Sequence, residues 1–122
     1  MSFTLLFPGQ GSQYVGMGAS FFASSAGARL VEEAESALGF SLTKIMLSGS
    51  QEELTSTAIA QPAILLHSIA AFMALKERHS LEIGCAIGHS LGEYSALVAA
   101  GVIKFSDAIK AVHIRGRLMQ EA

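Results

Sequence analysis

The sequence has little cysteine and little charge, and each shortage argues against certain classes of protein. Its 122 residues include one cysteine, Cys85, so no internal disulfide can form and a reducing compartment is indicated. Charged residues make up only 15% and the formal net charge is −2, which argues against nucleic acid or an anionic membrane as a partner. The longest apolar stretch, residues 58–75, is interrupted by Pro62 and His67, and it predicts a buried helix rather than a membrane span.

Apolar residues are abundant, but they occur in short segments. Hydrophobic residues make up 51% of a chain whose length fits one domain, so residues 1–122 are taken as a single unit. No basic segment opens the chain, and Phe3–Phe7 is too short for the core of a signal peptide, so a cytoplasmic location is expected. Cys85 lies in an apolar run and is expected to pack in the core.

The hydrophobic pattern predicts an α/β protein with few strands. Two buried parallel strands are expected, Phe3–Phe7 and roughly 83–87, which is a small sheet for the number of helices. His67, within the most apolar helix, is expected to be a hydrogen-bonded core histidine. Helices are predicted over residues 26–38, 41–47, 62–79, 93–100 and 106–122, with one further turn opened by a capping box at 50–53.

The segment Gly88-His89-Ser90-Leu91-Gly92 has the pattern of a nucleophile elbow. A short apolar run precedes this Gly-x-Ser-x-Gly and a helix-forming run follows it, which is the strand–turn–helix context that such an elbow requires. The turn would present the Ser90 hydroxyl at the N-terminal end of the next helix, where backbone N–H groups favour negative charge. One oxyanion donor would be the N–H of Leu91, and a second would come from the loop around Gln10.

That early loop, residues 8–18, is rich in glycine but does not match a phosphate-binding motif. The dinucleotide pattern fails because Tyr14 stands where its third glycine belongs. The P-loop pattern fails because Met17-Gly18 replaces the lysine and the hydroxyl residue. We therefore expect no phosphate site there.

The residues do not supply a complete catalytic triad. Ser90, Asp107 and His113 occur in the chain order of α/β-hydrolases. Six positions apart on one helix, however, Asp107 and His113 would differ by roughly 120° in direction and about 9 Å in height. His89 is a poor candidate for the base because adjacent side chains at a tight turn point apart. A base for Ser90 is therefore not found among these residues.

Arg115 is predicted to lie on the apolar face of the last helix. A helical wheel places it with Ala108, Ala111, Val112 and Met119, and a guanidinium in such surroundings needs an anionic partner. Two interpretations remain open on this evidence. One is an internal salt bridge with a glutamate, and the other is a bidentate clamp for the carboxylate of a substrate.

Four motifs together resemble one family, the malonyl-CoA:acyl carrier protein transacylases and the related polyketide acyltransferase domains. The motifs occur in the order of that family and span nearly the whole chain. They are residues 7–13 (Phe-Pro-Gly-Gln-Gly-Ser-Gln), 61–63 (Gln-Pro-Ala), 88–93 (Gly-His-Ser-Leu-Gly-Glu) and 115–120 (Arg-Gly-Arg-Leu-Met-Gln).

The resemblance implies a role for each of these motifs. Ser90 would be the nucleophile that carries malonyl as an ester, and the N–H groups of Gln10 and Leu91 would form the oxyanion hole. Arg115 would bind the free malonyl carboxylate. The pocket around it would be lined by Gln61 and Met119.

The implied reaction moves malonyl from coenzyme A to the serine, and then to the phosphopantetheine thiol of acyl carrier protein. The coenzyme A thioester is the substrate, and neither a metal nor another cofactor is implied. The pathway would be fatty acid biosynthesis.

The resemblance also implies that residues 1–122 are the N-terminal portion of an α/β-hydrolase-like acyltransferase domain, without the ferredoxin-like subdomain of the family. The catalytic histidine of the family lies in the missing C-terminal portion, so the chain alone is expected to be inactive. Two alternatives remain open. One is a serine esterase or thioesterase that uses the same elbow, and the other is a truncated, non-catalytic binding module.

Overall fold

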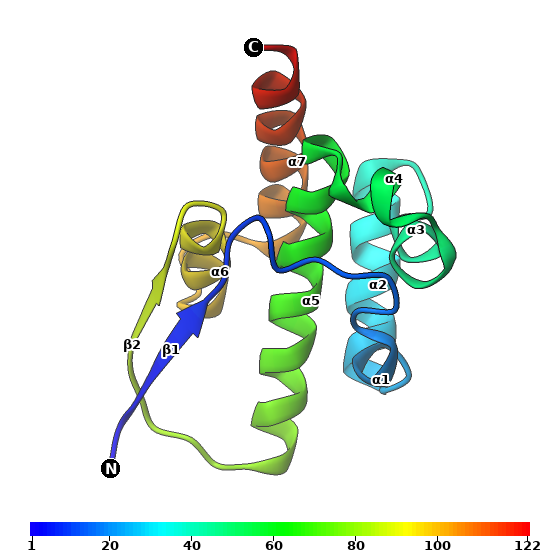
Figure 1. Ribbon diagram of the computed structural model, residues 1–122. Coiled ribbons are helices and arrows are strands. Elements are labelled where there is room, and N and C mark those ends of the chain that lie inside the picture. The colour runs from blue at the N-terminus through cyan, green and yellow to red at the C-terminus, as the bar shows by residue number, and fades with distance from the viewer.

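The computed structural model describes residues 1–122, which form two strands and seven helices (Figure 1). The chain begins with a strand, passes through five helices, returns to a second strand and ends in two helices. In chain order the elements are β1 (Phe3–Phe7), α1 (Ala19–Phe22), α2 (Ser25–Leu38), α3 (Leu42–Ser48), α4 (Gln51–Thr55), α5 (Thr57–Arg78), β2 (Ile83–Gly88), α6 (Gly92–Ala99) and α7 (Phe105–Glu121).

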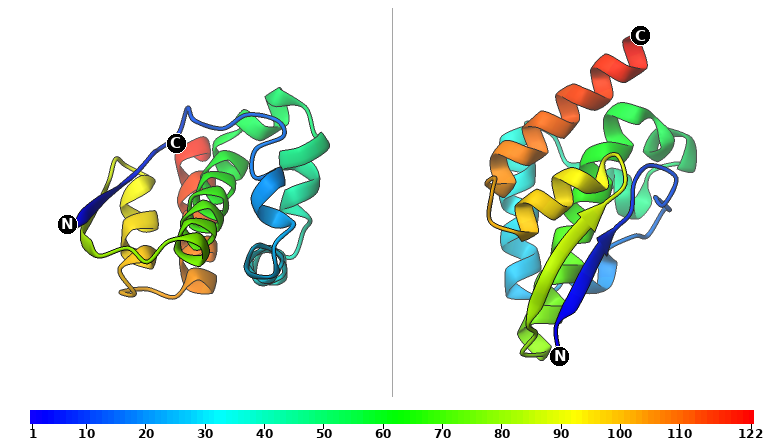
Figure 2. Two further views of the ribbon diagram at one scale, coloured as in Figure 1. Left: turned by 90° about the horizontal axis from the view of Figure 1, so that it is seen from below. Right: turned by 90° about the vertical axis from the view of Figure 1, so that its left-hand side faces the viewer.

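The two strands form a parallel pair, which confirms the predicted parallel sheet. They run side by side in the right-hand view of Figure 2, and the pairing ends with Phe7 opposite Gly88. Both strands therefore finish at the same edge of the sheet. The loop after β1 and the turn after β2 meet there, which is where parallel α/β sheets commonly place their sites.

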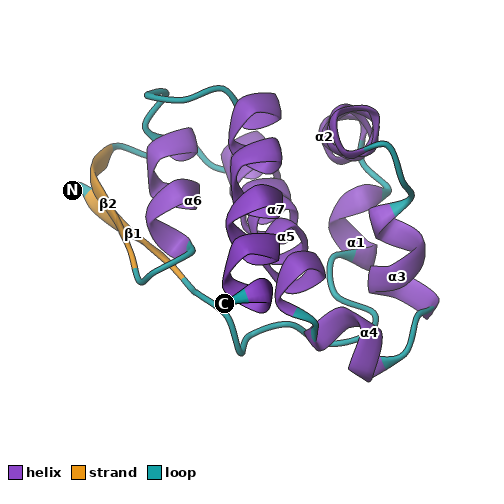
Figure 3. Ribbon diagram, turned by 90° about the horizontal axis from the view of Figure 1, so that it is seen from above, coloured by secondary structure: helices purple, strands orange, loops and turns teal.

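The remaining elements lie in layers beside the strands, as seen from above in Figure 3. Helix α6 lies next to the strands, α5 and α7 form the centre, and α1–α4 lie on the far side. The core is centred on α5, with Leu65 and Leu66 fully buried against Met46 of α3 and Ile109 of α7. By length and composition α5 could cross a membrane, but 56% of its apolar window is buried inside the protein.

The strands are more exposed than the sequence predicts. Leu6 is 71% exposed and Ile87 is 56% exposed, because nothing within residues 1–122 packs on the outer side of the two strands. The same geometry corrects the expectation for Cys85. Its thiol is exposed rather than packed in the core, and its Sγ lies 3.3 Å from Thr4 Oγ1.

Several helix ends differ from the prediction. Helix α5 begins at Thr57, five residues before the expected start, so Pro62 lies inside the helix rather than at its first position. Helix α7 begins at Phe105, one residue before the predicted start, and its N-cap makes no side-chain hydrogen bond. The capping serine of α4 is confirmed, because Ser50 Oγ accepts the N–H of Glu53 at 3.0 Å.

Glu35 on α2 caps the beginning of α3. Its Oε2 accepts hydrogen bonds from the Thr43 N–H at 2.9 Å and from the Thr43 hydroxyl at 2.8 Å. The residue at the N-cap of α3, Ser41, makes no capping bond with its own side chain. Glu35 therefore satisfies a free N–H in the first turn of α3.

Candidate active site

Ser90 occupies the sharp turn between β2 and α6, as the strand–turn–helix pattern predicts. Its φ of 55° makes it the only residue other than glycine with a positive φ in the chain. A side chain in that region of backbone space costs on the order of 1–3 kcal/mol, and such strain is concentrated at functional positions. The exposed hydroxyl of Ser90 is thus held in the conformation of a nucleophile elbow.

Two glycines allow the turn to close. A Cβ on Gly88 would collide with the carbonyl of Gly92, and a Cβ on Gly92 would collide with the carbonyl of Phe7. The turn is also bonded to the end of β1, because the N–H of His89 donates to the Phe7 carbonyl at 3.3 Å. The elbow therefore packs directly on the beginning of the loop that carries Gln10.

The two predicted oxyanion donors are the N–H groups of Leu91 and Gln10, and both are free of hydrogen bonds within the protein. Leu91 is nevertheless fully buried. The Gln10 loop lies against the elbow, since a Cβ on Gly9 would come within 2.6 Å of the His89 carbonyl oxygen. Free backbone N–H groups beside a nucleophile can stabilise an oxyanion, so these two N–H groups stay the predicted donors.

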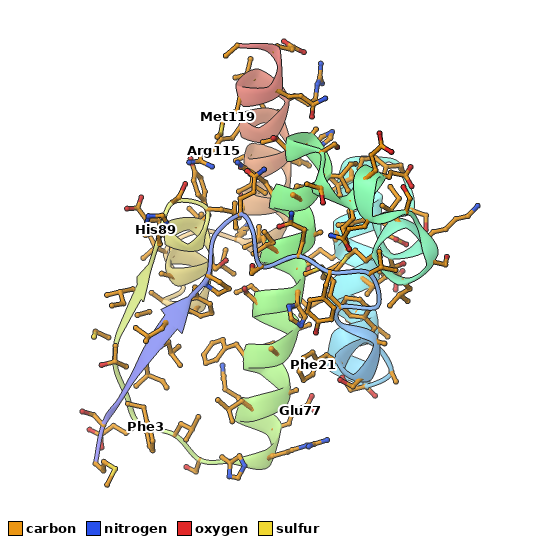
Figure 4. The ribbon with its side chains drawn as sticks, viewed as in Figure 1. Phe3, Phe21, Glu77, His89, Arg115 and Met119 are labelled. Atoms are coloured by element: carbon orange, nitrogen blue, oxygen red, sulfur yellow. The ribbon has the colours of Figure 1, made fainter.

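Four predicted site residues form one continuous series of hydrogen bonds. Arg115 Nη2 donates to Ser90 Oγ at 3.1 Å, and Arg115 Nη1 donates to Gln61 Oε1 at 2.9 Å. Gln61 Nε2 in turn lies 3.2 Å from Met119 Sδ. Figure 4 shows Arg115 and Met119 on α7, on the side that faces the turn carrying His89. The structure therefore brings α5, α7 and the elbow together at Ser90.

The charge of Arg115 has no carboxylate partner. Both of its hydrogen-bond acceptors are neutral, and the Tyr94 ring lies 5.6 Å from its guanidinium carbon, within cation–π range. The alternative of an internal salt bridge with a glutamate is therefore wrong. A guanidinium held by neutral groups keeps its capacity to bind an anion.

Arg115 does not lie at the centre of the buried face of α7, as the helical wheel predicted. Ala111 and Met119 are exposed, the latter by 48%. Arg115 itself is only partly buried and lies at the edge of the helix that faces Ser90. The residues of α7 that are buried are Phe105, Ala108, Ile109, Val112 and Gly116.

None of the four histidines forms a hydrogen bond with Ser90. The only hydrogen-bond partner of Ser90 Oγ is Arg115, and the ring of His113 is bonded instead to the Ala58 carbonyl. No group of three His, Cys, Asp or Glu residues is placed to hold a metal ion. The chain thus places the Ser90 hydroxyl beside the Arg115 guanidinium, and no histidine is bonded to the serine.

His67 differs from its predicted role. It makes no hydrogen bond and instead packs against the rings of Tyr14 and Phe21, with centroid distances of 6.2 and 5.7 Å. Burial lowers the pKa of the His67 imidazole below its usual value of 6.5.

Two further residues contact the site and were not identified from the sequence. Thr57 Oγ1 accepts a hydrogen bond from Gln10 Nε2 at 3.3 Å, and Tyr94 lies beside Arg115. Tyr94 is four residues after Ser90 on the helix that follows the elbow, which was the one available signal. Nothing in the sequence connects Thr57 with Gln10.

A serine with a positive φ at a strand–turn–helix elbow is typical of serine-dependent α/β enzymes. The sequence comparison names the family within that class. Residues 4–122 match the acyl transferase domain, and the chain belongs to that family.

The curated relatives are malonyl CoA-acyl carrier protein transacylases. The protein of Escherichia coli is 47% identical over 124 residues, which cover 98% of this chain and 39% of the relative. The protein of Bacillus subtilis strain 168 is 48% identical over 118 residues, or 96% of this chain and 37% of the relative. The chain therefore spans well under half the length of these relatives.

Solved structures agree with the fold. The malonyl CoA-acyl carrier protein transacylase of Coxiella burnetii superposes with a TM-score of 0.94 at 41% identity, covering 99% of this chain and 39% of that one. A malonyl transacylase in complex with the acyl carrier protein of a type II polyketide synthase gives a TM-score of 0.92 at 44% identity, covering 99% and 40%. These matches confirm the α/β fold as the N-terminal part of an acyltransferase.

Proposed function

We propose that the chain supplies the acyl-accepting half of a malonyl-CoA:acyl carrier protein transacylase, with Ser90 as the nucleophile. The observation that carries this proposal is the position of Arg115, which touches the strained Ser90 and has no anionic partner. A cation beside a nucleophile selects an acyl group that has a second, negatively charged end.

In the first half of the reaction, Ser90 Oγ attacks the thioester carbonyl carbon of malonyl-CoA. The N–H groups of Leu91 and Gln10 receive the oxyanion that develops. The carbon–sulfur bond then breaks, coenzyme A leaves as the thiol with the proton that the serine gave up, and malonyl remains as the Ser90 ester. The second half reverses these steps with the phosphopantetheine thiol of acyl carrier protein as the acceptor.

Arg115 would hold the free malonyl carboxylate while Gln61 fixes the orientation of the guanidinium. Gln61 is 1% exposed and neutral, so it positions Arg115 without cancelling its charge. Met119, which contacts Gln61, would form the wall of the same pocket. The reaction that results is a transfer between two thiols, with no metal or redox cofactor in either step.

The base that accepts the Ser90 proton would come from outside residues 1–122. An arginine guanidinium has no acceptor atom, so Arg115 cannot take that role. Support comes from the Ser90 hydroxyl, which has no histidine partner here, and from the relatives, which are more than twice as long. The remaining part of such a protein is therefore proposed as a partner of this chain.

Acyl carrier protein is the proposed acceptor, supported by the related transacylase that was solved in complex with a carrier protein. The proposal is tested by comparing malonyl transfer with acetyl transfer in the complete protein that carries residues 1–122. Arg115→Ala should lower kcat/KM for malonyl transfer about 10- to 100-fold, because a charge-assisted hydrogen bond contributes about 1.5–3 kcal/mol. Acetyl transfer should change little.

Equal losses for both acyl groups would contradict the role of Arg115. Release of free malonate faster than formation of the malonyl-carrier product would instead favour a thioesterase. Arg115→Lys is the matched control, because lysine keeps the charge but loses the planar fork that holds Gln61 and a carboxylate together.

A further inference from the structure

One face of α7 is bonded to the first turn of α5 through the carbonyl and the N–H of Ala58. The Ala58 carbonyl accepts a hydrogen bond from His113 Nδ1 at 3.0 Å, and the Ala58 N–H donates to Gln120 Oε1 at 3.2 Å. Gly116 lies between them, and a Cβ there would come within 2.5 Å of the Thr57 carbonyl oxygen. His113, Gly116 and Gln120 are spaced i, i+3 and i+7, so they form a single line along the helix.

The bond from His113 replaces one that α5 cannot make. In an α-helix the Ala58 carbonyl would accept from the N–H of residue 62, but that residue is Pro62, which has no N–H. Because a carbonyl oxygen can only accept, the hydrogen must reside on Nδ1 of His113. Pro62 is buried and Ala58 is partly buried, and a side chain of α7 bonds the carbonyl that Pro62 leaves without a partner in α5.

The turn that His113 holds is the one that supports the candidate active site. Gln61 is one turn after Ala58 and bonds both Arg115 and Met119. Thr57, the residue before Ala58, accepts the bond from the Gln10 side chain. A shift of this turn would therefore move the groups that orient Arg115.

We propose that His113 is a positioning residue for the Arg115 guanidinium, acting through Ala58 and Gln61. The inference rests on the proposed function, because it concerns recognition of the malonyl carboxylate. His113 touches neither Ser90 nor Arg115 by any hydrogen bond, so its effect is on geometry and not on the chemistry of transfer.

The first test compares two variants of His113 in the complete protein. His113→Leu removes the donor and should lower kcat/KM for malonyl transfer about tenfold, while acetyl transfer changes less than about twofold, since small misplacements of a binding group are costly. His113→Asn places an amide N–H close to the position of Nδ1 and should restore malonyl transfer. Equal losses of malonyl and acetyl transfer in His113→Leu would overturn the proposal in favour of a purely structural role.

The second test uses Pro62 to isolate the hydrogen bond. Pro62→Ala restores an N–H that can donate to the Ala58 carbonyl within α5. In that background His113→Leu should lower malonyl transfer less than about twofold, because the carbonyl keeps a donor. A tenfold loss in both backgrounds would overturn the proposal.

The third test does not depend on activity. Nitrogen-15 NMR of neutral His113 should show the hydrogen on Nδ1. The exposed His79 serves as the reference spectrum. A hydrogen on Nε2 of His113 would overturn the inference even in an enzyme that transfers malonyl. Absence of malonyl transfer in the unmodified protein, with the hydrogen on Nδ1, would overturn the proposed function and with it the role of His113 in recognition, but not the bond to Ala58.

Discussion

Gln61 Oε1 accepts a hydrogen bond from Arg115 Nη1 at 2.9 Å, although 54 positions separate the two residues in the chain. The glutamine is almost fully buried, and its amide is neutral. The contact therefore fixes the direction of the guanidinium and leaves its positive charge free for a ligand. A carboxylate at the same place would fix the direction as well but would neutralise the charge.

Gln61→Glu should consequently be more harmful to malonyl transfer than Gln61→Ala. The glutamate has the same shape but forms an ion pair with Arg115 and competes with the substrate carboxylate, so kcat/KM for malonyl transfer should fall at least about tenfold further than in Gln61→Ala. Steady-state kinetics of the complete protein measure this difference, with acetyl transfer as the control. If the two variants lose malonyl transfer equally, the charge of Arg115 is not what selects the acyl group.

The close packing at the elbow predicts that Gly88 cannot be replaced by alanine. The new Cβ would meet the Gly92 carbonyl, which is rigid backbone, so the free energy of unfolding should fall by about 3 kcal/mol or more, at the upper end for overpacking. Gly39→Ala is the matched control, because a Cβ there has no neighbour and only its φ of 81° is unfavourable, at about 1–2 kcal/mol. Denaturant unfolding measures both values, and equal losses would show that the elbow can relax.

The partly buried imidazole of His67 predicts a dependence of stability on pH. Burial holds its pKa below 6.5, so between the folded pKa and 6.5 the unfolded chain binds more protons than the folded one. The free energy of unfolding should therefore fall as the pH drops below 6.5, and this group should have no effect at higher pH.

His67→Gln should flatten that part of the curve of melting temperature against pH. His79→Gln, at the exposed C-terminal cap of α5, is the matched control for the loss of an imidazole at the surface. A curve that keeps its slope below pH 6.5 in His67→Gln would assign the dependence to another group.

The elbow was predictable from the sequence because everything that forms it is local. Gly88, Ser90 and Gly92 lie within five residues, and the strand before them and the helix after them have clear hydrophobic patterns. The positive φ of Ser90 and the collision that a Cβ at Gly88 would make with the Gly92 carbonyl both follow from that short segment.

The partners of Arg115 were not predictable in the same way. A helical wheel describes one helix alone, and it placed Arg115 in the middle of an apolar face because it could not show which side meets α5. Excluding the salt bridge required the actual partners of Arg115, such as Gln61, which only the packing of α5 against α7 supplies. The family resemblance suggested the grouping, and the structure shows that it forms.

The start of α5 was predicted wrongly because local sequence patterns do not show contacts with distant residues. Proline is tolerated at the first position of a helix, so the sequence favoured a start there. The helix instead begins at Thr57, because the carbonyl that Pro62 leaves free is satisfied by His113, 55 residues away from Ala58. The exposure of the two strands was missed for another reason. Their apolar residues predict burial on both faces, but residues 1–122 contain no element that packs on the outer face.

The central claim is that Ser90 carries the malonyl group as an ester, and intact mass spectrometry tests it most directly. The complete protein is mixed with malonyl-CoA in the absence of acyl carrier protein and quenched in acid. The mass should rise by one malonyl group, the adduct should map to the peptide containing Ser90, and holo acyl carrier protein should remove it. Ser90→Ala should show no adduct. An adduct that persists in Ser90→Ala, or malonyl transfer to the carrier without any adduct on Ser90, would contradict the account.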